Sequence, residues 1–457
     1  MHIVIIGNGI AGVTAARFIR KLSDHRITIV SGESDHFFSR TALMYIYMGH
    51  MRFEDTKPYE DWFWEKNRIE LRRAWIQVVD TENKSLQTAD GDTIGYDKLI
   101  LACGSTPNKF GWPGQDLKNV GGMVSLQDLA RMEAASKDLD RAVVVGGGLI
   151  GIEMAEMFHS RHIPVTMLVR EHSYWSGVLP PEESAMVNRQ IKQHGIDLRL
   201  GAELESIDDN GFGSVASVTT KDGVRIPCGF VGLTAGVHPT IKWLTGSGIE
   251  TDKGILVDRH LQTNIPDVYA VGDCMELREP PPARRAIEAV WYVGRMSGET
   301  VAYNVCGKPV AYDPGIWFNS AKFIDLEYQV YGDLKAKRDE GIDTFYWEHP
   351  EGEKSVRIDF EAESQSVIGF NLMGIRYRHE VCDRWLREKT PIQEVIPHLG
   401  LANFDPEFYR EHEPEIVAAF NRQTGSNLQL KTRRGLGKVL SFLRGRSVSS
   451  RDRLVKR

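Results

Sequence analysis

Two glycine-rich motifs with the spacing G-x-G-x-x-G lie in this chain, at residues 7–12 and 146–151. Each directly follows a short apolar stretch that is typical of a buried strand, and each leads into an amphipathic segment. In such a motif the first glycine permits a tight turn, the second lets the backbone approach a pyrophosphate, and the third lets the helix pack on the strand. The phosphates then meet the helix N-terminus, where free N–H groups and the helix dipole favour an anion. Two such motifs predict two bound dinucleotides that exchange electrons.

The elements expected around the motifs follow one plan twice. Residues 2–31 are predicted to form strand, glycine turn, helix and strand, and residues 141–169 repeat that order. Short meander strands are expected near 75–94 and 198–227, and each group is followed by a closing apolar strand. Because the second copy is inserted before the first is complete, we predict an α/β fold with two nested Rossmann-like domains.

With 457 residues, the chain is too long for a single hydrophobic core. We expect a discontinuous first domain (1–108 and 253–311), a second domain inserted in it (109–252), a C-terminal α+β domain (312–425) and a basic tail (426–457). A core strand at the start of the sequence and the lack of an apolar run of about 20 residues favour a cytoplasmic protein.

Small residues and an acid follow the predicted closing strands, where a chain must cross close to a bound nucleotide. The first strand ends in Ala-Cys-Gly at 102–104, and the second ends in Ala-Gly at 235–236. Gly272 and Asp273 follow a third apolar strand, at 268–271. An aspartate there can accept hydrogen bonds from a ribose or ribityl hydroxyl, and a turn with a helix cap is the plainer alternative for this pair.

Together these motifs resemble the FAD-dependent pyridine nucleotide-disulfide oxidoreductases of the glutathione-reductase-like fold, over about residues 1–310. Within that superfamily, the segment Phe38-Ser39-Arg40 followed by Leu43 is similar to ferredoxin and rubredoxin reductases and to the NAD(P)H module of nitrite reductases. The resemblance implies FAD at the first motif and NADH or NADPH at the second, with hydride transfer from nicotinamide to flavin. It also implies a homodimer whose C-terminal α+β domain forms the interface, and a small ferredoxin- or rubredoxin-type protein as electron acceptor.

The resemblance assigns roles to two groups of residues, and it places Arg40 near the FAD pyrophosphate. The group expected to bind FAD comprises Gly7, Gly9, Ile10, Ala11, Gly12, Glu33, Arg40, Ala102, Gly104, Gly272, Asp273, Glu288 and Trp291. The group expected to bind NAD(P)H comprises Gly146, Gly148, Leu149, Ile150, Gly151, Glu153, Arg170 and Gly236. Glu288 and Trp291 are expected on a helix beneath the flavin. Glu153 is the one candidate for catalytic support of nicotinamide and flavin, with an ordinary surface glutamate as the alternative.

Two departures from the resemblance concern the acceptor. Thr41 stands where the peroxidase and NADH-oxidase branch carries a reactive cysteine, and a threonine cannot form a sulfenic acid. Ferredoxin-reductase relatives often carry a lysine near Met44 as the partner of Glu153, and it is missing here.

The five cysteines (Cys103, Cys228, Cys274, Cys306 and Cys382) contain no C-x-x-C pair, which argues against a redox dithiol and an iron–sulfur cluster. None of the fourteen histidines has a spacing typical of metal ligands, so no metal is expected.

The choice between NADH and NADPH stays open in the sequence. Arg170 follows the second strand of the inserted domain and could pair with a 2′-phosphate, whereas the adjacent Glu171 could bind ribose hydroxyls and repel that phosphate. At the first site, Glu33 is the candidate for the adenosine ribose of FAD. Trp317 and Phe318, in an aromatic stretch, are expected in the core of the C-terminal domain or over the flavin.

Charge is distributed unevenly along the chain. Residues Lys431 to Arg457 hold ten Lys and Arg and one Asp, although the whole chain has a net charge of −6. This tail is either a solvated extension or an arm that docks a small acidic redox protein; membrane contact is a weaker alternative, and no nucleic acid is expected. Two other functions remain open: an NADH oxidase that uses oxygen, and a redox-responsive sensor similar to apoptosis-inducing factor.

Overall fold

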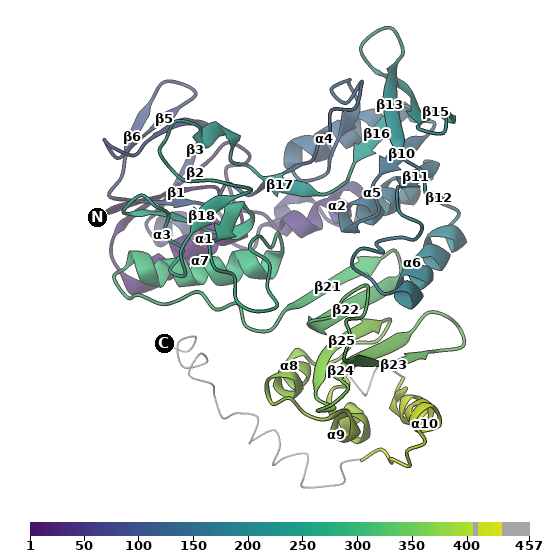
Figure 1. Cartoon of the computed structure of the whole chain (residues 1–457). Coiled ribbons are helices and arrows are strands. Elements are labelled where there is room, and N and C mark those ends of the chain that lie inside the picture. Colours follow the sequence, from purple (N-terminus) through teal and green to yellow (C-terminus); the bar gives the residue numbers. More distant parts are fainter. Residues whose placement is uncertain (405–409, 432–457) are drawn as a thin grey trace. The chain divides into compact units, whose positions relative to one another are not determined.

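The computed structural model describes residues 1–404 and 410–431 (Figure 1). The chain divides into two compact units, Met1–Leu326 and a second that begins at Glu327. Within the described ranges, no helix has the length and apolar character needed to cross a membrane. Apart from Lys431, the predicted docking arm lies outside the described residues.

The first unit contains two five-stranded parallel sheets with the same arrangement of four strands; the fifth, edge strand is the last of its sheet in the chain in one (β19) and the first in the other (β9). The strand order of one is β3-β2-β1-β7-β19, and that of the other is β12-β11-β10-β16-β9. The strands of the first are β1 (His2–Ile6), β2 (Arg26–Ser31), β3 (Ile69–Arg73), β7 (Lys98–Leu101) and β19 (Val268–Ala270). The strands of the second are β9 (Val120–Gly121), β10 (Ala142–Val145), β11 (Val165–Val169), β12 (Asp197–Leu200) and β16 (Phe230–Leu233). The predicted fold of two nested dinucleotide-binding domains is therefore confirmed.

A three-stranded antiparallel meander accompanies each parallel sheet. The first is β4 (Ile76–Asp80), β5 (Ser85–Thr88) and β6 (Thr93–Gly95); the second is β13 (Leu204–Asp209), β14 (Val215–Thr220) and β15 (Arg225–Pro227). The two segments that connect the domains also pair with each other, as β8 (Ser105–Pro107) and β17 (Val237–Pro239). The remaining elements of the first unit are α2 (Leu43–Tyr47), α3 (Trp62–Lys66), α4 (Leu126–Ala135), α6 (Pro181–Gln193), β18 (Ile255–Val257), β20 (Met275–Leu277) and β21 (Phe318–Phe323).

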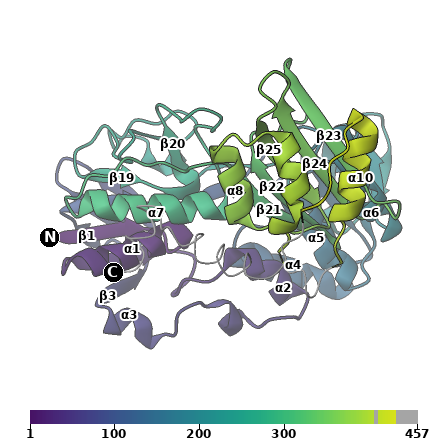
Figure 2. The same cartoon turned by 90° about the horizontal axis from the view of Figure 1, so that it is seen from below.

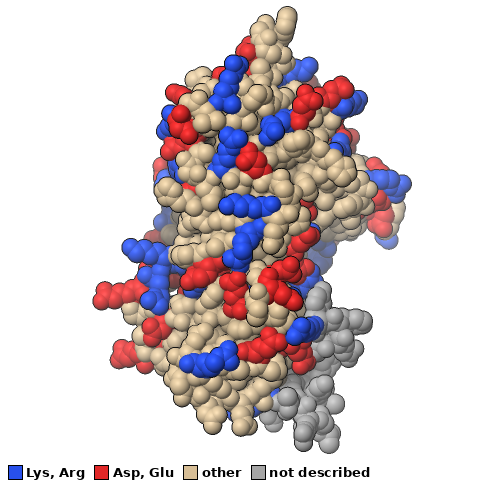
Figure 3. Space-filling model, turned by 90° about the vertical axis from the view of Figure 1, so that its right-hand side faces the viewer, with Lys and Arg blue, Asp and Glu red and all other residues tan. Residues whose placement is uncertain are grey.

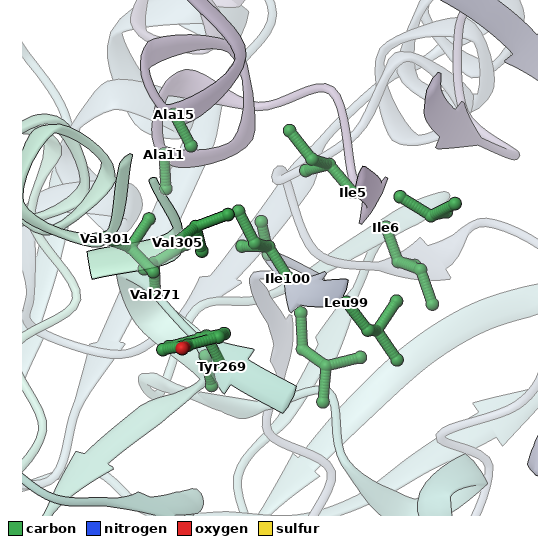
Figure 4. Close-up of a cluster of buried hydrophobic side chains, with 14 of the residues drawn as sticks. Ile5, Ile6, Ala11, Ala15, Leu99, Ile100, Tyr269, Val271, Val301 and Val305 are labelled. Atoms are coloured by element: carbon green, nitrogen blue, oxygen red, sulfur yellow. The ribbon is translucent and has the colours of Figure 1, made fainter. Parts of the chain in front are cut away.

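Helices α1 (Ile10–Leu22) and α7 (Trp291–Val305) lie side by side against the first sheet (Figures 1 and 2). Their approach depends on missing side chains: a Cβ atom at Gly298 would lie 2.3 Å from the Ala11 carbonyl oxygen. Ile5, Ile100 and Val271 belong to the buried cluster between these helices and the sheet (Figure 4). This core holds the glycine turn after β1 beside the loop that follows β19.

The second unit is α+β, as predicted. Its antiparallel strands have the order β22-β25-β24-β23, and three helices cover one face of the sheet (Figures 1 and 2). The strands are β22 (Leu326–Gly332), β23 (Ile342–Glu348), β24 (Ser355–Glu361) and β25 (Val367–Met373), and the helices are α8 (His379–Arg387), α9 (Ile392–Val395) and α10 (Glu413–Thr424).

Candidate dinucleotide-binding sites

The first glycine motif lies in the turn between β1 and α1, and its three glycines meet different surroundings. Gly7 has φ +109°, and a Cβ atom there would lie 2.1 Å from the carbonyl oxygen of Ala102. A Cβ atom at Gly12 would lie 2.1 Å from the Gly7 carbonyl oxygen. Gly9 has φ −72°, and nothing lies within 4 Å of its Cβ position. The fold itself therefore requires Gly7 and Gly12, whereas the open space at Gly9 suits a ligand.

The second motif, between β10 and α5 (Leu149–Ser160), repeats this division. Gly146 has φ +130°, and its Cβ position lies 2.6 Å from the carbonyl oxygen of Thr234. The Cβ position of Gly151 lies 2.8 Å from the Gly146 carbonyl oxygen. At Gly148 the conformation is extended (φ −117°), and the nearest atom is Nε1 of Trp175 at 4.0 Å. The space in front of each middle glycine is therefore open at the Cβ position.

Both helices that follow the motifs begin without a side-chain cap. Gly9 and Gly148 are the N-cap residues of α1 and α5, so no side chain accepts from the first N–H groups of either helix. Ile10 with Ala11, and Leu149 with Ile150, form the first turns and contribute these backbone donors. Free N–H groups at a helix N-terminus are the arrangement that binds phosphate.

Asp273 lies in the turn Gly272–Cys274 directly after β19, beside the first motif. Ser105 donates a hydrogen bond of 2.9 Å to its Oδ2 atom. Burial raises the pKa of the Asp273 carboxyl, and both the Ser105 hydrogen bond and the charge of Arg40 act in the opposite direction. Gly104, next to Ser105 in the chain, has φ +69° and nothing within 4 Å of its Cβ position. A buried acceptor next to open space fits the hydroxyl-rich ribityl chain of FAD.

Glu33 and Arg40, both assigned to FAD from the sequence, bind each other. Arg40 Nη2 lies 2.6 Å from Glu33 Oε2, and the backbone N–H of Leu126 donates to Glu33 Oε1 at 3.1 Å. The carboxylate thus joins Arg40 to the N-terminus of α4. The guanidinium also lies 5.1 Å from the ring centre of Phe38. These contacts fix the position of the Arg40 guanidinium.

Glu288 lies outside the helix on which it was expected, because α7 begins only at Trp291, after the extended residue Val290. Its side chain forms an ion pair with Arg284, and the two side chains are only 7% and 4% exposed. Arg284 also donates to the carbonyl oxygen of Gly315 at 2.9 Å. Glu288 therefore binds the chain itself, whereas Trp291, 37% exposed, keeps an open face.

The guanidinium of Arg284 lies 5.3 Å from the ring centre of Trp317, one of the two aromatic candidates. Sequence reasoning missed Arg284, because nothing in its local spacing shows that its charge is buried. The other candidate, Phe318, begins β21 and packs against Tyr292 with the ring centres 4.5 Å apart.

The structure brings together two cysteines that are far apart in the sequence. The thiol of Cys103 forms a hydrogen bond with that of Cys274, and burial with this bond raises the pKa of Cys103 well above its ordinary value. Cys103 also donates to the Thr240 carbonyl oxygen at 3.3 Å, and Cys274 donates to that of Val271 at 3.3 Å. A thiol with a raised pKa is a poor nucleophile, so Cys103 has the environment of a packing residue. The hydrogen bond with Cys103 lowers the pKa of the Cys274 thiol.

In the second domain, Arg170 follows β11 directly and pairs with Glu171 at 2.9 Å. The two residues that were expected to favour different coenzymes thus form an ion pair with each other. Gly236, with φ +86°, lies in the loop before β17, and its Cβ position is 3.1 Å from Nδ2 of Asn108. Any side chain there would displace Asn108.

Glu153 lies in the first half of α5, and its environment differs from that of a surface glutamate. Burial, with a contribution from the charge of Glu156, raises the pKa of Glu153 to about 7. Thr41 lies in the turn Arg40–Ala42 and its hydroxyl is 3.2 Å from that of Ser39, while Met44 is buried in α2. A carboxyl with a pKa near neutrality can exchange a proton at physiological pH, as a catalytic acid or base must.

This pKa makes a stability prediction with a defined sign. The folded chain keeps a proton on Glu153 between about pH 4.5 and 7, whereas the unfolded chain has lost it, so wild-type stability falls as the pH rises through this range. Glu153→Gln removes this titration. Between pH 5 and pH 8, the free energy of unfolding of the variant is therefore expected to increase relative to that of wild type by about 2 kcal/mol. Urea unfolding of the apoprotein at both pH values measures this difference. Glu205→Gln, at an exposed position of the same domain, is the control, and an equal response of both variants would contradict the prediction.

Comparison with known proteins agrees with this geometry. Residues 1–293 match the family described as pyridine nucleotide-disulphide oxidoreductase. The ferredoxin reductase subunit of 5,5′-dehydrodivanillate O-demethylase from Sphingobium sp. is 30% identical over 346 residues, 74% of this chain and 83% of that protein. Nitrite reductase [NAD(P)H] from Bacillus subtilis is 34% identical over 61% of this chain, and the chain spans about a third (34%) of its length.

Among solved structures, a ferredoxin reductase from Rhodopseudomonas palustris superimposes with a TM-score of 0.74 at 23% identity, over 81% of this chain and 91% of that one. At this identity the likeness concerns the fold. The comparisons confirm the predicted superfamily and the predicted class of enzyme, an FAD-dependent oxidoreductase that uses a nicotinamide coenzyme; the roles of single residues remain predictions. The chain belongs to the pyridine nucleotide-disulphide oxidoreductase family.

Proposed function

We propose that this enzyme takes electrons from NADH or NADPH and passes them through FAD to a separate small redox protein. The observation that carries the proposal is the open space at Gly9 and at Gly148, each at the uncapped start of a helix and each in one of two nested domains. Residues 1–108 with 253–311 would hold FAD, and residues 109–252 would hold the coenzyme. Bound FAD would supply the chemistry that takes up a two-electron hydride and releases the electrons one at a time.

The chain's own residues would bind and orient the two dinucleotides. The backbone N–H groups of α1 and α5 would hold the two diphosphates, and Asp273 would accept from a ribityl hydroxyl. Arg40 would stay near the FAD diphosphate through its pair with Glu33. Trp291, at the start of α7, would border the flavin, and Glu153 would support the nicotinamide with a carboxyl that can be neutral at pH 7.

A protein acceptor is favoured by the relatives and by the thiols of this chain. The names of two relatives, a ferredoxin reductase subunit and a nitric oxide reductase FlRd-NAD(+) reductase from Klebsiella pneumoniae, state such acceptors for those proteins. Thr41 has no thiol that could carry electrons as a cysteine would. The thiols of Cys103 and Cys274 donate hydrogen bonds to backbone carbonyl oxygens. On the face in Figure 3, basic and acidic side chains are interspersed without a large patch of one sign. The proposed contact for an acidic partner is the basic arm from Lys431 onward. We also propose that the enzyme is a homodimer and cytoplasmic.

Anaerobic stopped-flow reduction tests this function. The purified chain should be yellow with one FAD, and NADH or NADPH should bleach it. Adding ferredoxin or rubredoxin should restore the colour much faster than adding oxygen does. Rapid oxygen consumption without a protein acceptor would instead identify an oxidase, and bleaching too slow for any acceptor to accelerate would favour a redox sensor.

Coenzyme preference is expected to change when the Arg170–Glu171 pair is broken. Arg170→Ala should raise the KM for NADPH about tenfold more than that for NADH, since only a 2′-phosphate gains a charge-assisted contact from the guanidinium. Glu171→Ala should act in the opposite direction, because it removes repulsion of the phosphate. Steady-state kinetics of both variants with both coenzymes measures the change. Equal changes in both KM values would show that the ribose lies elsewhere.

A further inference from the structure

Three potential metal ligands meet in the second unit, at the end of a strand and the start of a helix. His349 directly follows β23, His412 is the N-cap residue of α10, and Glu415 lies in the first turn of that helix. Their ligand atoms all lie within 4.8 Å of one another. Glu415 Oε2 is 3.5 Å from His412 Nδ1 and 3.9 Å from His349 Nε2. Two ligands of a tetrahedral zinc ion are separated by about 3.3 Å, so small side-chain shifts would complete the site.

The imidazole of His412 is buried. Its residue is 4% exposed, and neither ring nitrogen has a hydrogen-bond partner among the residues that the structure describes. A buried polar group in this condition is costly unless a partner is added. Trp347 packs against both imidazoles, with ring centres 5.9 Å from His349 and 5.8 Å from His412, and so keeps solvent from them. Nε2 of His412 is thus available to a ligand, and Nδ1 faces the carboxylate of Glu415.

Neighbouring groups contact two of the three side chains. Arg410 binds Oε1 of Glu415 at 3.3 Å, which leaves Oε2 toward the two histidines. Nδ1 of His349 accepts a hydrogen bond of 3.3 Å from the backbone N–H of Glu351, and the carboxylate Oε2 of Glu351 lies 3.4 Å from the same nitrogen. Coordination through Nε2 would move the proton to Nδ1 and replace the backbone bond by one to this carboxylate, the partner that metal-bound histidines commonly have.

His412 also lines a cavity of about 60 Å³, together with Asn403, Arg410 and Glu413 among others. This space is large enough for a water molecule beside His412.

We propose that His349, His412 and Glu415 bind a divalent transition-metal ion, with Zn²⁺ as the best match. Two imidazoles and one carboxylate suit zinc and other first-row metals, whereas calcium and magnesium require mainly oxygen ligands. The ion would join the end of β23 to the start of α10 and thereby stabilise this edge of the second unit. The spacing of histidines in the sequence showed no such site, because His349 comes from another element than His412 and Glu415.

The test uses the full chain with FAD, first stripped of metal by a chelator. After dialysis against Zn²⁺ and removal of the excess, elemental analysis should find one zinc per chain, and zinc should raise the unfolding temperature. His412→Gln should weaken zinc binding about 100-fold, and Glu415→Gln should weaken it at least tenfold. Competition with a chromophoric chelator measures both affinities. His398→Gln, outside the cluster on the same unit, should bind like wild type.

X-ray absorption of zinc-loaded wild type keeps the test decisive if a variant does not fold. A zinc shell with two imidazoles and oxygen ligands is expected. A shell of thiolates, zinc affinity equal in wild type and both cluster variants, or no zinc retained by wild type would each overturn the proposal. FAD content and reduction by NAD(P)H should be the same in all these variants, which separates the metal site from the proposed reductase function.

Discussion

Gly9→Val is expected to fold without FAD, and Gly148→Val is expected to bind FAD but to lose its reduction by NAD(P)H. Neither glycine is needed by the fold itself, because both have extended conformations that any residue adopts and neither Cβ position has a protein atom closer than 4.0 Å. Their missing side chains matter only to a ligand that approaches the backbone. We expect at least a 100-fold loss of affinity at the site concerned, since a valine would occupy the space of the diphosphate.

Flavin absorbance, coenzyme titration and circular dichroism measure these outcomes. Gly95→Val is the matched control, since Gly95 in β6 also has open space at its Cβ position but lies away from both motifs; it should keep both ligands. Gly12→Val should instead fail to fold, because its Cβ atom would collide with the Gly7 carbonyl oxygen. FAD bound normally by Gly9→Val would refute the assignment of the first motif.

Glu288→Ala is expected to destabilise the first unit by about 3–5 kcal/mol, because it leaves a buried guanidinium without its partner. Arg284 is 4% exposed, and its other polar contact is the carbonyl oxygen of Gly315. Replacing both charges, as in Arg284→Met with Glu288→Leu, should recover most of the loss, since buried ion pairs are often no more stable than apolar residues of similar volume. Denaturant unfolding followed by tryptophan fluorescence measures the three variants against wild type.

This series also separates the two roles considered for Glu288. If Glu288 only supports the chain, Glu288→Ala should lose FAD in proportion to its loss of stability, and the double variant should bind FAD again. If Glu288 contacts the flavin instead, the double variant would regain stability but not FAD affinity. Glu279→Ala, at an exposed position of the same segment, is the control for nonspecific effects.

Local features of the sequence predicted the elements well. The strand, glycine turn, helix and strand predicted for residues 2–31 are β1, the first glycine turn, α1 and β2, and residues 141–169 repeat them as β10, the second turn, α5 and β11. These elements depend on neighbouring residues: apolar runs form buried strands, and the glycine motif forces the turn.

By itself, the sequence determined the doubled plan, the family and the two glycine turns, because each of these follows from spacing within about thirty residues. Only the tertiary structure decided which glycines the fold needs and which leave space for a ligand, since that depends on the carbonyl groups of Ala102 and Thr234, in distant strands. It likewise decided that Glu288 pairs with Arg284, that Cys103 meets Cys274, and that His349 reaches His412 and Glu415. Burial, charge pairing and the meeting of distant side chains are properties of packing, which no local pattern of residues contains.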